Sequence, residues 1–423
     1  MKAVVMAGGK GTRMAGICAE LPKPMLPLSG KPILEREIEV LKKEGFSDII
    51  LVISHLGDAI REYFGDGAAF GVCITYCEEK EPLGTAGALA LLKDTLAGDD
   101  FLLLNGDLLF DVDLSRFLAY HREKGGIATV LTHPSSHPAD SVLVACDKSE
   151  RVTAFLPPDT ARPATKNRTN AGLHFFSSAI LSRFDEIKKT DLDREILTPL
   201  AAEGQLFAYH SPEYVKDMGT PTRFAEGERD LKRGLPQSLK QPRPAIFLDR
   251  DGTINRHVGF VTSPDQIELL EGAAEAIKRL NDRHVPVIVV TNQPVLARGE
   301  VDEAGLGAIH ARLEALLAER GAHLTDIFYC PHHPDGGFAG EVAVLKRPCH
   351  CRKPAPGLLL AAAAKYNISL SHSYMIGDSD SDMEAGRRAG CRTAAIGKMS
   401  ADIVGNSLLD CIDQILKNED FHA

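Results

Sequence analysis

A short apolar run ends in two aspartates at residues 245–253, which read AIFLDRDGT. The run predicts a buried β-strand, and Asp249 and Asp251 follow it at the carboxyl end, where open α/β sheets bind ligands. Two carboxylates one residue apart can divide the work of phosphoryl transfer, because one can attack phosphorus while the other handles the proton of the leaving group. A hard divalent cation would offset the charge on nucleophile and phosphate, and we expect that cation to be Mg²⁺.

Two more predicted strands end in polar residues farther along the chain. VIVVTNQ ends in Thr291 and Asn292, whose side chains can both donate hydrogen bonds to a phosphoryl oxygen, and the stretch CRKP adds the cation of Lys353. A third strand, in SYMIGDSDSD, ends in Asp378, and this aspartate and the two that follow suit a metal ion. One acidic strand end often only caps a helix, but three polar strand ends in this order favour a catalytic site.

Three cysteines and three histidines lie in one polar stretch, residues 330–354. Cys330 and His332 are separated by one residue, as are Cys349 and Cys351, so each pair can bind one metal from a tight turn. Three sulfurs and one nitrogen suit a closed tetrahedral Zn²⁺ site, and we assign the zinc to these four. Either of the two other histidines in the stretch could replace His332, and reduced loop cysteines without metal are the simpler alternative.

These motifs resemble the haloacid dehalogenase superfamily of phosphohydrolases. DRDGTIN, TNQ and a zinc loop ending in RKP are similar to its group of D-glycero-D-manno-heptose 1,7-bisphosphate 7-phosphatases and histidinol-phosphate phosphatases. The resemblance implies that Asp249 becomes an aspartyl-phosphate and that Asp251 protonates the departing sugar oxygen and then activates water. It also implies Mg²⁺ between Asp249, the Asp251 carbonyl and Asp378, with a zinc that only shapes its loop. Arg352 would contact the substrate, and Arg298 is a candidate for its second phosphate.

The first half of the chain has its own glycine-rich turn after an apolar strand. The stretch MAGGKGTRM contains Gly8, Gly9, Gly11, Thr12 and Arg13. Glycines let backbone N–H groups approach a triphosphate, and basic side chains offset its charge, although such a turn alone is weak evidence. The following stretch PKPMLPLSGKP strengthens this interpretation, since Lys23 is held between two prolines.

Two aspartates complete this second set of candidate residues. Asp107 ends the apolar strand LLLNGD, and Asp217 lies in VKDMGT after another strand. Each alone could cap a helix, but together they could share one Mg²⁺. With the glycine-rich turn and Lys23 they have the parts for in-line attack on an α-phosphorus, where positioning and charge neutralisation do most of the work.

GGKGTRM, PKPMLPL, EPLGTAGAL, NGD, NAG and KDMGT, in this order, resemble the sugar-1-phosphate nucleotidyltransferases over about residues 1–230. The resemblance implies roles in binding the triphosphate, the base and ribose, the metal and the sugar. It assigns Gly8 to Arg13 and Lys23 to the triphosphate, and Gly84 and Thr85 to the base and ribose. It assigns Asp107 and Asp217 to the metal, and Asn170 and Gly172 to the sugar. Among these transferases the D-glycero-alpha-D-manno-heptose 1-phosphate guanylyltransferases are the most similar group, which implies GTP as the donor and a GDP-heptose as the product.

One departure from that pattern concerns the sugar pocket. Many relatives carry a glutamate and a lysine after the phenylalanine that precedes NAG, whereas Phe155 is followed here by LPPDTARPATKNRT. We therefore expect the sugar contacts to come from Lys166 or Arg168.

Strand-like and helical patterns alternate in both halves, which predicts an α/β protein. We expect an N-terminal Rossmann-like nucleotidyltransferase domain with a mixed sheet over residues 1–233. The proline-rich stretch 234–243 would be a linker. A haloacid dehalogenase-like Rossmannoid domain with a zinc-binding loop would cover 244–423.

Whole-chain composition limits the partners. The 423 residues carry a formal net charge of -10, so no global basic field would hold nucleic acid or an anionic membrane. The N-terminus shows no signal-peptide pattern, no apolar run approaches about 18 residues, and nine cysteines without an export signal argue against a disulfide framework. We expect a soluble cytoplasmic protein whose partners are sugar phosphates and a nucleoside triphosphate; a homo-oligomer stays open.

The combination of the two domains favours consecutive reactions. A heptose bisphosphate phosphatase produces the heptose 1-phosphate that a nucleotidyltransferase can consume, giving a GDP-heptose. Two alternatives stay open: a transferase for another sugar 1-phosphate joined to a histidinol-phosphate-type or other sugar phosphatase, or a non-catalytic first half that senses a nucleotide sugar and regulates the phosphatase. The altered segment 155–169 is the reason for keeping the last of these.

Overall fold

The computed structural model describes residues 1–9, 21–54, 56–135, 141–158, 165–337 and 339–418. The chain divides into two compact units, which are described separately. Unit 1 comprises Met1–His133, Val144–Leu156 and Arg168–Lys240, and unit 2 comprises Pro134–Leu143, Pro157–Asn167 and Gln241–Ala423. Both units are α/β, which confirms the predicted two-domain class.

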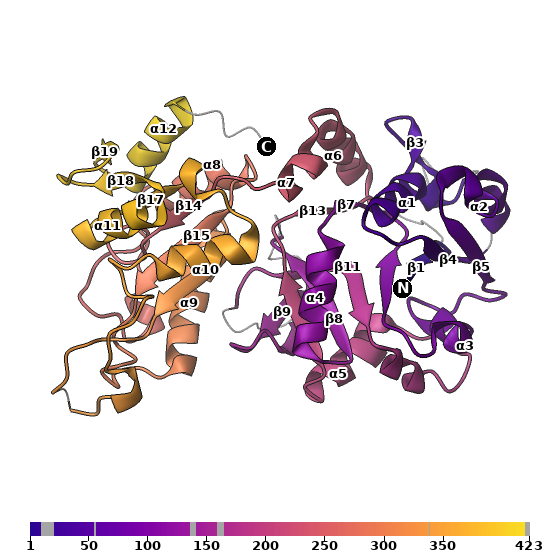
Figure 1. Ribbon diagram of the computed structural model, residues 1–423, viewed down its shortest axis with the longest axis horizontal. Helices are drawn as coiled ribbons and strands as arrows, with labels where there is room; N and C mark the ends of the chain where they lie inside the picture. Colours follow the sequence, from indigo (N-terminus) through magenta and orange to yellow (C-terminus); the bar gives the residue numbers. More distant parts are fainter. Residues whose placement is uncertain (10–20, 55, 136–140, 159–164, 338, 419–423) are drawn as a thin grey trace. The chain divides into compact units, whose positions relative to one another are not determined.

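Unit 1 is built on a mixed sheet (Figure 1). Its strands are β1 (Lys2–Met6), β4 (Asp48–Ile53), β5 (Cys73–Glu78), β6 (Phe101–Asn105), β8 (Ala128–His133), β9 (Leu143–Cys146), β10 (Val152–Leu156), β11 (Thr169–Phe176) and β12 (Leu206–His210). Parallel pairing joins β1 to β4 and β6, and β4 to β5, whereas β11 runs antiparallel to β6 and β8. The carboxyl ends of β1 and β6 therefore lie side by side, which brings Met6 and Ala7, the residues before Gly8, next to the NGD motif.

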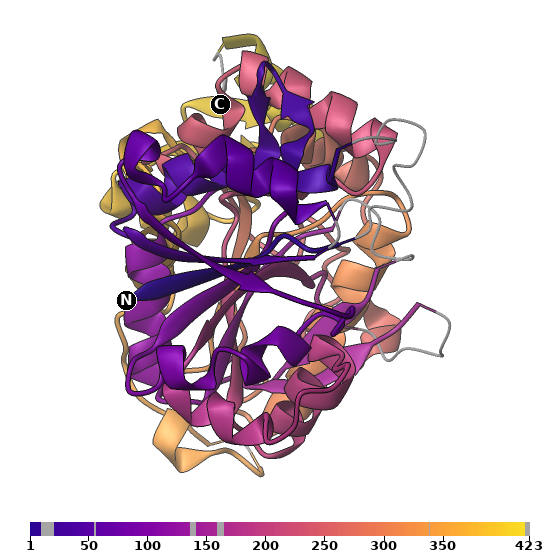
Figure 2. The ribbon, with the colours of Figure 1, turned by 90° about the vertical axis from the view of Figure 1, so that its right-hand side faces the viewer.

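Helices cover both faces of this sheet, as Figure 2 shows. The helices of unit 1 are α1 (Ile33–Lys43), α2 (Gly57–Phe64), α3 (Lys93–Leu96), α4 (Leu114–Lys124), α5 (Thr198–Ala202), α6 (Pro221–Lys232) and α7 (Leu235–Lys240). Successive β1 residues alternate between the faces, since Val5 packs with α1, α2 and α4 and Val4 packs with α3 and α5. Helix α7 lies inside the stretch expected to be a linker, with Leu235 and Leu239 buried.

A separate two-stranded sheet in unit 1 carries the second pair of aspartates. It consists of β7 (Leu108–Asp111) and β13 (Tyr214–Asp217), which pair in antiparallel orientation with Asp217 opposite Leu108. The N–H of Met218 donates to the carbonyl oxygen of Asp107 at 2.8 Å. The backbone thus ties the segments that carry Asp107 and Asp217 to each other.

Unit 2 contains a six-stranded parallel sheet. In sheet order its strands are β16 (Asp326–Cys330), β15 (Val287–Asn292), β14 (Ile246–Leu248), β17 (Tyr374–Gly377), β18 (Arg392–Ile396) and β19 (Ile403–Gly405). The two central strands, β14 and β17, are buried along their whole length. Because all these strands are parallel, the polar residues that end β14, β15 and β17 gather at one edge.

Helices pack on both faces of the second sheet (Figure 1). They are α8 (Ala273–Asn281), α9 (Glu303–Ala318), α10 (Gly357–Tyr366), α11 (Asp380–Ala389) and α12 (Leu408–Asn418). Leu248 packs with α8, α9 and α12, while Phe247 packs with α10 and α11. Among the described residues, no helix has the length and hydropathy needed to cross a membrane.

Candidate active sites

The polar strand ends of unit 2 line a cavity of about 410 Å³. Asp249 follows β14 directly, and its Oδ1 lies 2.8 Å from the Nζ atom of Lys353. Thr291 and Asn292, at the end of β15, line the same cavity with Asp378, which follows β17. The structure therefore brings together the residues that the three predicted strand ends supplied.

Lys353 is a buried cation held by two carboxylates. Its Nζ lies 2.6 Å from Asp382 Oδ1 as well as near Asp249, and its side chain is 1% exposed. Burial lowers the pKa of Lys353, but the charges of Asp249 and Asp382 outweigh burial, so the pKa is raised. Asn292 fixes the backbone of the lysine, because its Oδ1 accepts from Lys353 N–H at 3.0 Å and its Nδ2 donates to Lys353 O at 3.1 Å.

Two carboxylates that line the cavity and the fully buried Asp382 beside them suit a divalent cation. Ligand oxygens of Asp249, Asp378 and Asp382 lie within 4.8 Å of one another. Burial raises the pKa of both Asp249 and Asp378, and the nearby charge of Asp382 adds to each rise. Carboxylates crowded in this way favour a bound cation, so the donor set fits Mg²⁺.

Gly252 gives Asp378 the space for this position. The glycine has a φ of +81°, and a Cβ atom on it would lie 1.8 Å from Asp378 Oδ2. The glycine of DRDGT is therefore required both for the left-handed backbone and for the close approach of the carboxylate.

Asp251 is held as an anion by three neighbours. Arg250 donates to both of its oxygens, at 3.1 and 2.7 Å, Asn255 donates at 2.9 Å and Gln293 donates at 3.1 Å. Burial alone would raise the pKa of Asp251, but the charge of Arg250 and these hydrogen bonds outweigh it, so the pKa is lowered. Arg250 is fully buried, and its guanidinium is the main counter-charge to this carboxylate.

The four expected zinc ligands converge in the loop after β16. The sulfurs of Cys330, Cys349 and Cys351 lie 3.2 to 3.5 Å apart, and His332 Nδ1 lies 3.3 Å from Cys351 Sγ. Tetrahedral zinc with Zn–S bonds of about 2.3 Å separates its sulfurs by about 3.8 Å, so this cluster could bind zinc after a small expansion. The other two histidines of the stretch are not part of the cluster.

Of the two arginines expected to contact the substrate, Arg352 lines the cavity and Arg298 does not. Arg352 follows Cys351 directly, lines the cavity, and donates to the carbonyl oxygen of His332 at 3.3 Å. Arg298 instead pairs with Glu300 at 2.7 Å and lies over the ring of Phe260, at 4.4 Å from its centre. Phe260 lines the cavity, whereas Arg298 is not among the lining residues.

In unit 1, Lys23 forms an ion pair with Asp107. Asp217, the second predicted metal ligand, is paired with Arg223, whose Nη1 lies 2.7 and 2.6 Å from its two oxygens. Each carboxylate is thus balanced by one cation, and both belong to segments tied together by the β7–β13 ladder. Two carboxylates held in this way fit a divalent cation that takes its other ligands from phosphate oxygens. Gly11, Thr12 and Arg13 lie outside the described residues.

Four other predicted residues of unit 1, Gly8, Gly9, Gly84 and Thr85, lie outside its helices and strands. Gly8 accepts a hydrogen bond from Ser54 Oγ at its carbonyl oxygen, at 2.6 Å, and Gly9 is exposed. Gly84 has a φ of +82°, and a Cβ there would lie 2.6 Å from the carbonyl oxygen of Thr190. Thr85 holds the same segment, because its Oγ1 accepts from Leu192 N–H at 2.7 Å.

The NAG motif begins at Asn170 in β11. Asn170 Oδ1 accepts from the N–H of Gly172 at 2.9 Å, and Asn170 Nδ2 donates to Asp193 Oδ1 at 3.2 Å. Gly172 has a φ of +79°, and a Cβ there would lie 2.7 Å from the side chain of Asn105. This turn is therefore packed directly against the NGD motif.

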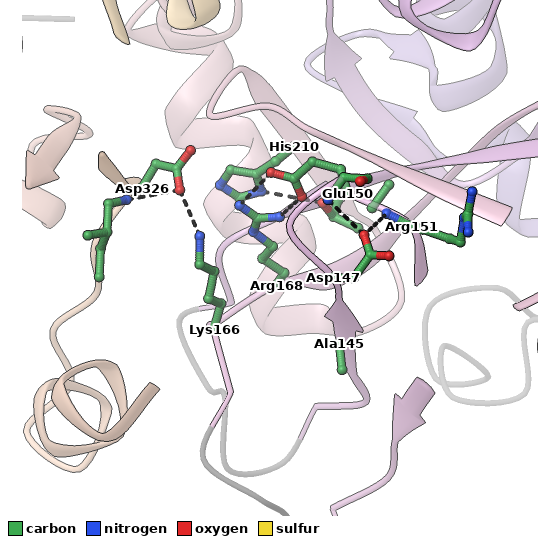
Figure 3. Close-up of polar contacts among 12 residues, drawn as sticks. Ala145, Asp147, Glu150, Arg151, Lys166, Arg168, His210 and Asp326 are labelled. Carbon is green, nitrogen blue, oxygen red and sulfur yellow. Dashed lines mark hydrogen bonds and ion pairs between the residues drawn. The ribbon is translucent and has the colours of Figure 1, made fainter. Parts of the chain in front are cut away.

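Lys166 and Arg168 have other partners than a sugar (Figure 3). Within unit 2, Lys166 Nζ lies 2.9 Å from Oδ1 of the buried Asp326, and within unit 1 Arg168, 3% exposed, pairs with Glu150. Both cations are therefore paired with carboxylates in this structure, and a role in binding the sugar stays a prediction.

Several residues of these sites had no role in the sequence-based prediction. They are Arg250, Gln293, His257 and Arg223, together with Asp382 as the partner of Lys353. Arg250 and Gln293 belong to motifs that were recognised, DRDGT and TNQ, and their polar character at the end of buried strands was the available signal. Nothing local distinguishes His257 or Arg223 from solvated residues.

Both units therefore place charged residues for phosphate chemistry at strand ends. The chain belongs to two families: the nucleotidyl transferase model matches residues 2–234, and the haloacid dehalogenase-like hydrolase model matches residues 139–390. It is a bifunctional enzyme with nucleotidyltransferase and phosphatase activities.

Comparison with individual proteins gives similarities to each half. The mannose-1-phosphate guanylyltransferase of Mycobacterium tuberculosis is 35% identical over 264 residues, which cover 62% of this chain and 71% of that protein. HddC from Yersinia pseudotuberculosis is 23% identical with a TM-score of 0.48, covering 54% of this chain and 99% of its own. The D,D-heptose 1.7-bisphosphate phosphatase from B. bronchiseptica, solved with magnesium and phosphate, is 35% identical with a TM-score of 0.37, covering 42% and 99%.

Proposed function

We propose that the chain catalyses two consecutive steps of nucleotide-activated heptose synthesis. The phosphatase unit removes the 7-phosphate of D-glycero-D-manno-heptose 1,7-bisphosphate. The transferase unit then joins the heptose 1-phosphate to GMP from GTP, releasing pyrophosphate and giving GDP-D-glycero-D-manno-heptose. The observation that carries the phosphatase step is the position of Asp249 at 2.8 Å from the buried Lys353, beside Asp378 and the Asp251 cradle.

In the first phosphatase step a carboxylate oxygen of Asp249 forms a bond to phosphorus. The bond between phosphorus and the sugar oxygen breaks, and that oxygen takes a proton from Asp251. The neighbours of Asp251 favour its anion, so the carboxyl has to leave Arg250 and Gln293 to donate a proton. In the second step water gives a proton to Asp251 and attacks phosphorus, which restores the Asp249 carboxylate and releases phosphate.

The surrounding residues of unit 2 neutralise and orient the phosphoryl group. Lys353 offsets negative charge on the phosphoryl oxygens and keeps Asp249 aligned. Mg²⁺, held by Asp249, the Asp251 carbonyl and Asp378, would supply further charge neutralisation. Zinc at the cysteine cluster would hold the loop that positions Arg352 against the substrate.

In the transferase step a phosphate oxygen of heptose 1-phosphate attacks the α-phosphorus of GTP. The bond from that phosphorus to the bridging oxygen breaks, and pyrophosphate leaves. Lys23 neutralises charge on the triphosphate, and Mg²⁺ at Asp107 and Asp217 would add to this. The 35% identity to a mannose-1-phosphate guanylyltransferase supports guanine as the base. The heptose assignment rests on the ordered motifs of unit 2 and on the match between the product of one reaction and the substrate of the other.

The same similarity favours a second candidate for the transferase acceptor. A relative named for mannose 1-phosphate supports a hexose 1-phosphate as the sugar, with the phosphatase unit acting on a different phosphomonoester. The two candidates share their chemistry and differ in the sugar bound near Asn170 and Gly172 and in the phosphomonoester that the phosphatase unit hydrolyses.

Phosphorus NMR on the purified chain with Mg²⁺ separates these candidates. Each anomer of the heptose bisphosphate is supplied first, followed by GTP and, separately, the other nucleoside triphosphates. We expect loss of the 7-phosphate signal and then a new diphosphate signal that appears with GTP and with no other nucleoside triphosphate. Turnover of mannose 1-phosphate or histidinol phosphate, with no reaction of the heptose bisphosphate, would overturn the heptose assignment.

Two variants assign each reaction to its unit. Asp249→Asn should reduce phosphate release by roughly a thousandfold or more and leave nucleotidyl transfer to heptose 1-phosphate unchanged. Asp107→Ala should do the reverse. Pyrophosphate release that persists in Asp107→Ala would contradict the transferase site. If a folded variant lost both activities, the two-site proposal would be wrong.

A further inference from the structure

Helix α1 buries a carboxyl group in the core of unit 1. Glu37 is 1% exposed and lies on the same side of the helix as the core residues Leu34 and Leu41. Its Oε1 accepts a hydrogen bond from the backbone N–H of Leu108 at 2.7 Å. A buried carboxyl costs several kcal/mol relative to an apolar side chain unless it satisfies another buried group, so its presence calls for a reason.

Leu108 is the residue that follows Asp107 and faces Asp217. In the β7–β13 ladder, Leu108 and Asp217 are opposite each other, and the bond from Met218 N–H to Asp107 O flanks this pair. In an antiparallel ladder with that bond, the N–H of Leu108 points away from β13. Within the described residues β7 pairs only with β13, so this buried N–H needs an acceptor from elsewhere. Glu37 supplies it.

The surroundings of the second oxygen of Glu37 favour the neutral form of the carboxyl. Oε2 is buried and has no hydrogen-bond partner within the described part of the chain. Burial raises the pKa of Glu37 well above its usual value; the Leu108 N–H lowers it, the charge of Asp107 raises it further and Lys23 lowers it. A neutral acid in this position can accept from Leu108 without adding a second negative charge beside Asp107.

We propose that Glu37 is a positioning residue of the nucleotidyltransferase site: it holds the Leu108 N–H and so fixes the backbone that carries Asp107 opposite Asp217. Glu37 acts through this backbone and does not touch the substrates. The inference rests on the proposed use of Asp107 and Asp217 at the transferase site. It adds a third element, α1, to the two strands that set the spacing of these carboxylates.

Glu37→Gln and Glu37→Met test this role with the full-length chain. The amide of glutamine keeps a neutral acceptor of the same length, so nucleotidyl transfer should stay within about twofold of wild type. Methionine keeps the length but has no oxygen acceptor, and a misplacement of about 1 Å can cost a hundredfold, so kcat should fall by roughly ten- to a hundredfold with little change in KM. The phosphatase rate of each variant is the internal control and should not change.

Hydrogen–deuterium exchange of peptides covering residues 105–112 gives a readout that needs no turnover. The Leu108 amide should be protected in wild type and Glu37→Gln and should exchange faster in Glu37→Met. Faster exchange with an unchanged kcat would overturn the positioning role, as would an equal loss of kcat in Glu37→Gln. If Glu37→Met does not fold, Glu37→Asp replaces it, because the shorter side chain withdraws the acceptor by one methylene. This variant should show a lower kcat of nucleotidyl transfer and weaker protection of the Leu108 amide. A wild-type kcat in Glu37→Asp would refute the proposal. Nucleotidyl transfer that persists in the Asp107→Ala variant would instead refute the proposed site itself.

Discussion

The Nζ atom of Lys353 lies 2.6 Å from Oδ1 of Asp382, and the two side chains are 1% and 0% exposed. Asp382 lies in the first turn of α11, and its Oδ2 accepts from Ser379 N–H at 3.1 Å and Ser379 Oγ at 2.7 Å. Each end of this ion pair is therefore fixed, Lys353 by Asn292 and Asp382 by Ser379. The lysine that pairs with Asp249, the proposed nucleophile, is thus held in position by Asp382 and Asn292.

Replacing Asp382 should impair the phosphatase and spare the transferase. In Asp382→Asn, Lys353 loses one of two counter-charges and is free to move toward Asp249. We expect kcat of phosphate release to fall about a hundredfold, because a small misplacement of a catalytic group has this effect. Asp380, which the sequence also suggested as a metal residue, is exposed and lies outside the group of Asp249, Asp378 and Asp382, so Asp380→Asn is the matched control in the same helical turn and should keep wild-type rates. Equal losses in both variants would show that the effect comes from the helix end.

The cradle of Asp251 predicts how stability depends on pH. Asp251→Asn leaves the buried Arg250 guanidinium without its carboxylate, and we expect a loss of roughly 3 kcal/mol in the unfolding free energy of unit 2. Because the pKa of Asp251 is lowered in the folded state, its contribution is fully present above the unfolded pKa and is lost only as pH falls through the folded value.

Calorimetry of wild type and Asp251→Asn from pH 7 downward checks this sign. The difference in melting temperature should be constant from pH 7 to about pH 4, near the ordinary pKa of aspartate, and should shrink only below it. A difference that shrinks between pH 7 and 5 would mean that the carboxyl is protonated in the folded protein near neutrality.

The strand ends could be predicted from sequence because their placement follows from a general rule. Apolar runs predicted the strands that precede Asp249 and Asp378, and parallel strands gather their carboxyl ends at one edge of the sheet. The clustering of Cys330, His332, Cys349 and Cys351 was predictable for a similar reason, since each Cys-x-Cys or Cys-x-His pair is local.

The supporting residues could not be predicted, because their partners are distant in sequence. Gln293 reaches Asp251 across 42 positions, and Glu37 reaches Leu108 across 71. On the sequence, Glu37 is one charged residue in an amphipathic helix. Only the packing of α1 on β7 turns it inward, and no periodicity encodes that contact. The ion pair between Arg168 and Glu150 was not predicted for the same reason.

Gly252 offers a test of the close packing beneath Asp378. Gly252→Ala places a methyl group 1.8 Å from Asp378 Oδ2 at a φ of +81°. The carboxylate of Asp378 therefore has to move away from those of Asp249 and Asp382. We expect loss of most phosphatase activity and a weaker response to Mg²⁺, measured by titrating the metal. The matched control is Gly390→Ala, which has a φ of +83° and open space around it. It should cost about 1 to 2 kcal/mol from the backbone strain alone and keep the activity.

The cysteine cluster predicts a link between metal content and substrate binding. Cys351→Ser removes a ligand directly before Arg352 and Lys353, so the loop should lose its metal and the arginine its position. We expect zinc, measured by atomic emission, to fall from about one per chain to near zero. KM of the phosphatase should rise about tenfold with a smaller change in kcat, since Lys353 keeps its contacts with Asn292 and Asp382.

Cys73→Ser provides the comparison for that variant, because Cys73 is exposed in β5 of unit 1 and lies outside the cluster. It should keep both the zinc and the phosphatase KM. Nucleotidyl transfer serves as a second reference and should be unchanged in both variants, since none of the four cluster residues belongs to unit 1. Wild-type protein that carries no zinc, or Cys351→Ser protein that keeps it, would contradict the assignment of zinc to these four residues. Loss of zinc without any change in KM would show that the metal stabilises the loop without placing Arg352 against the substrate.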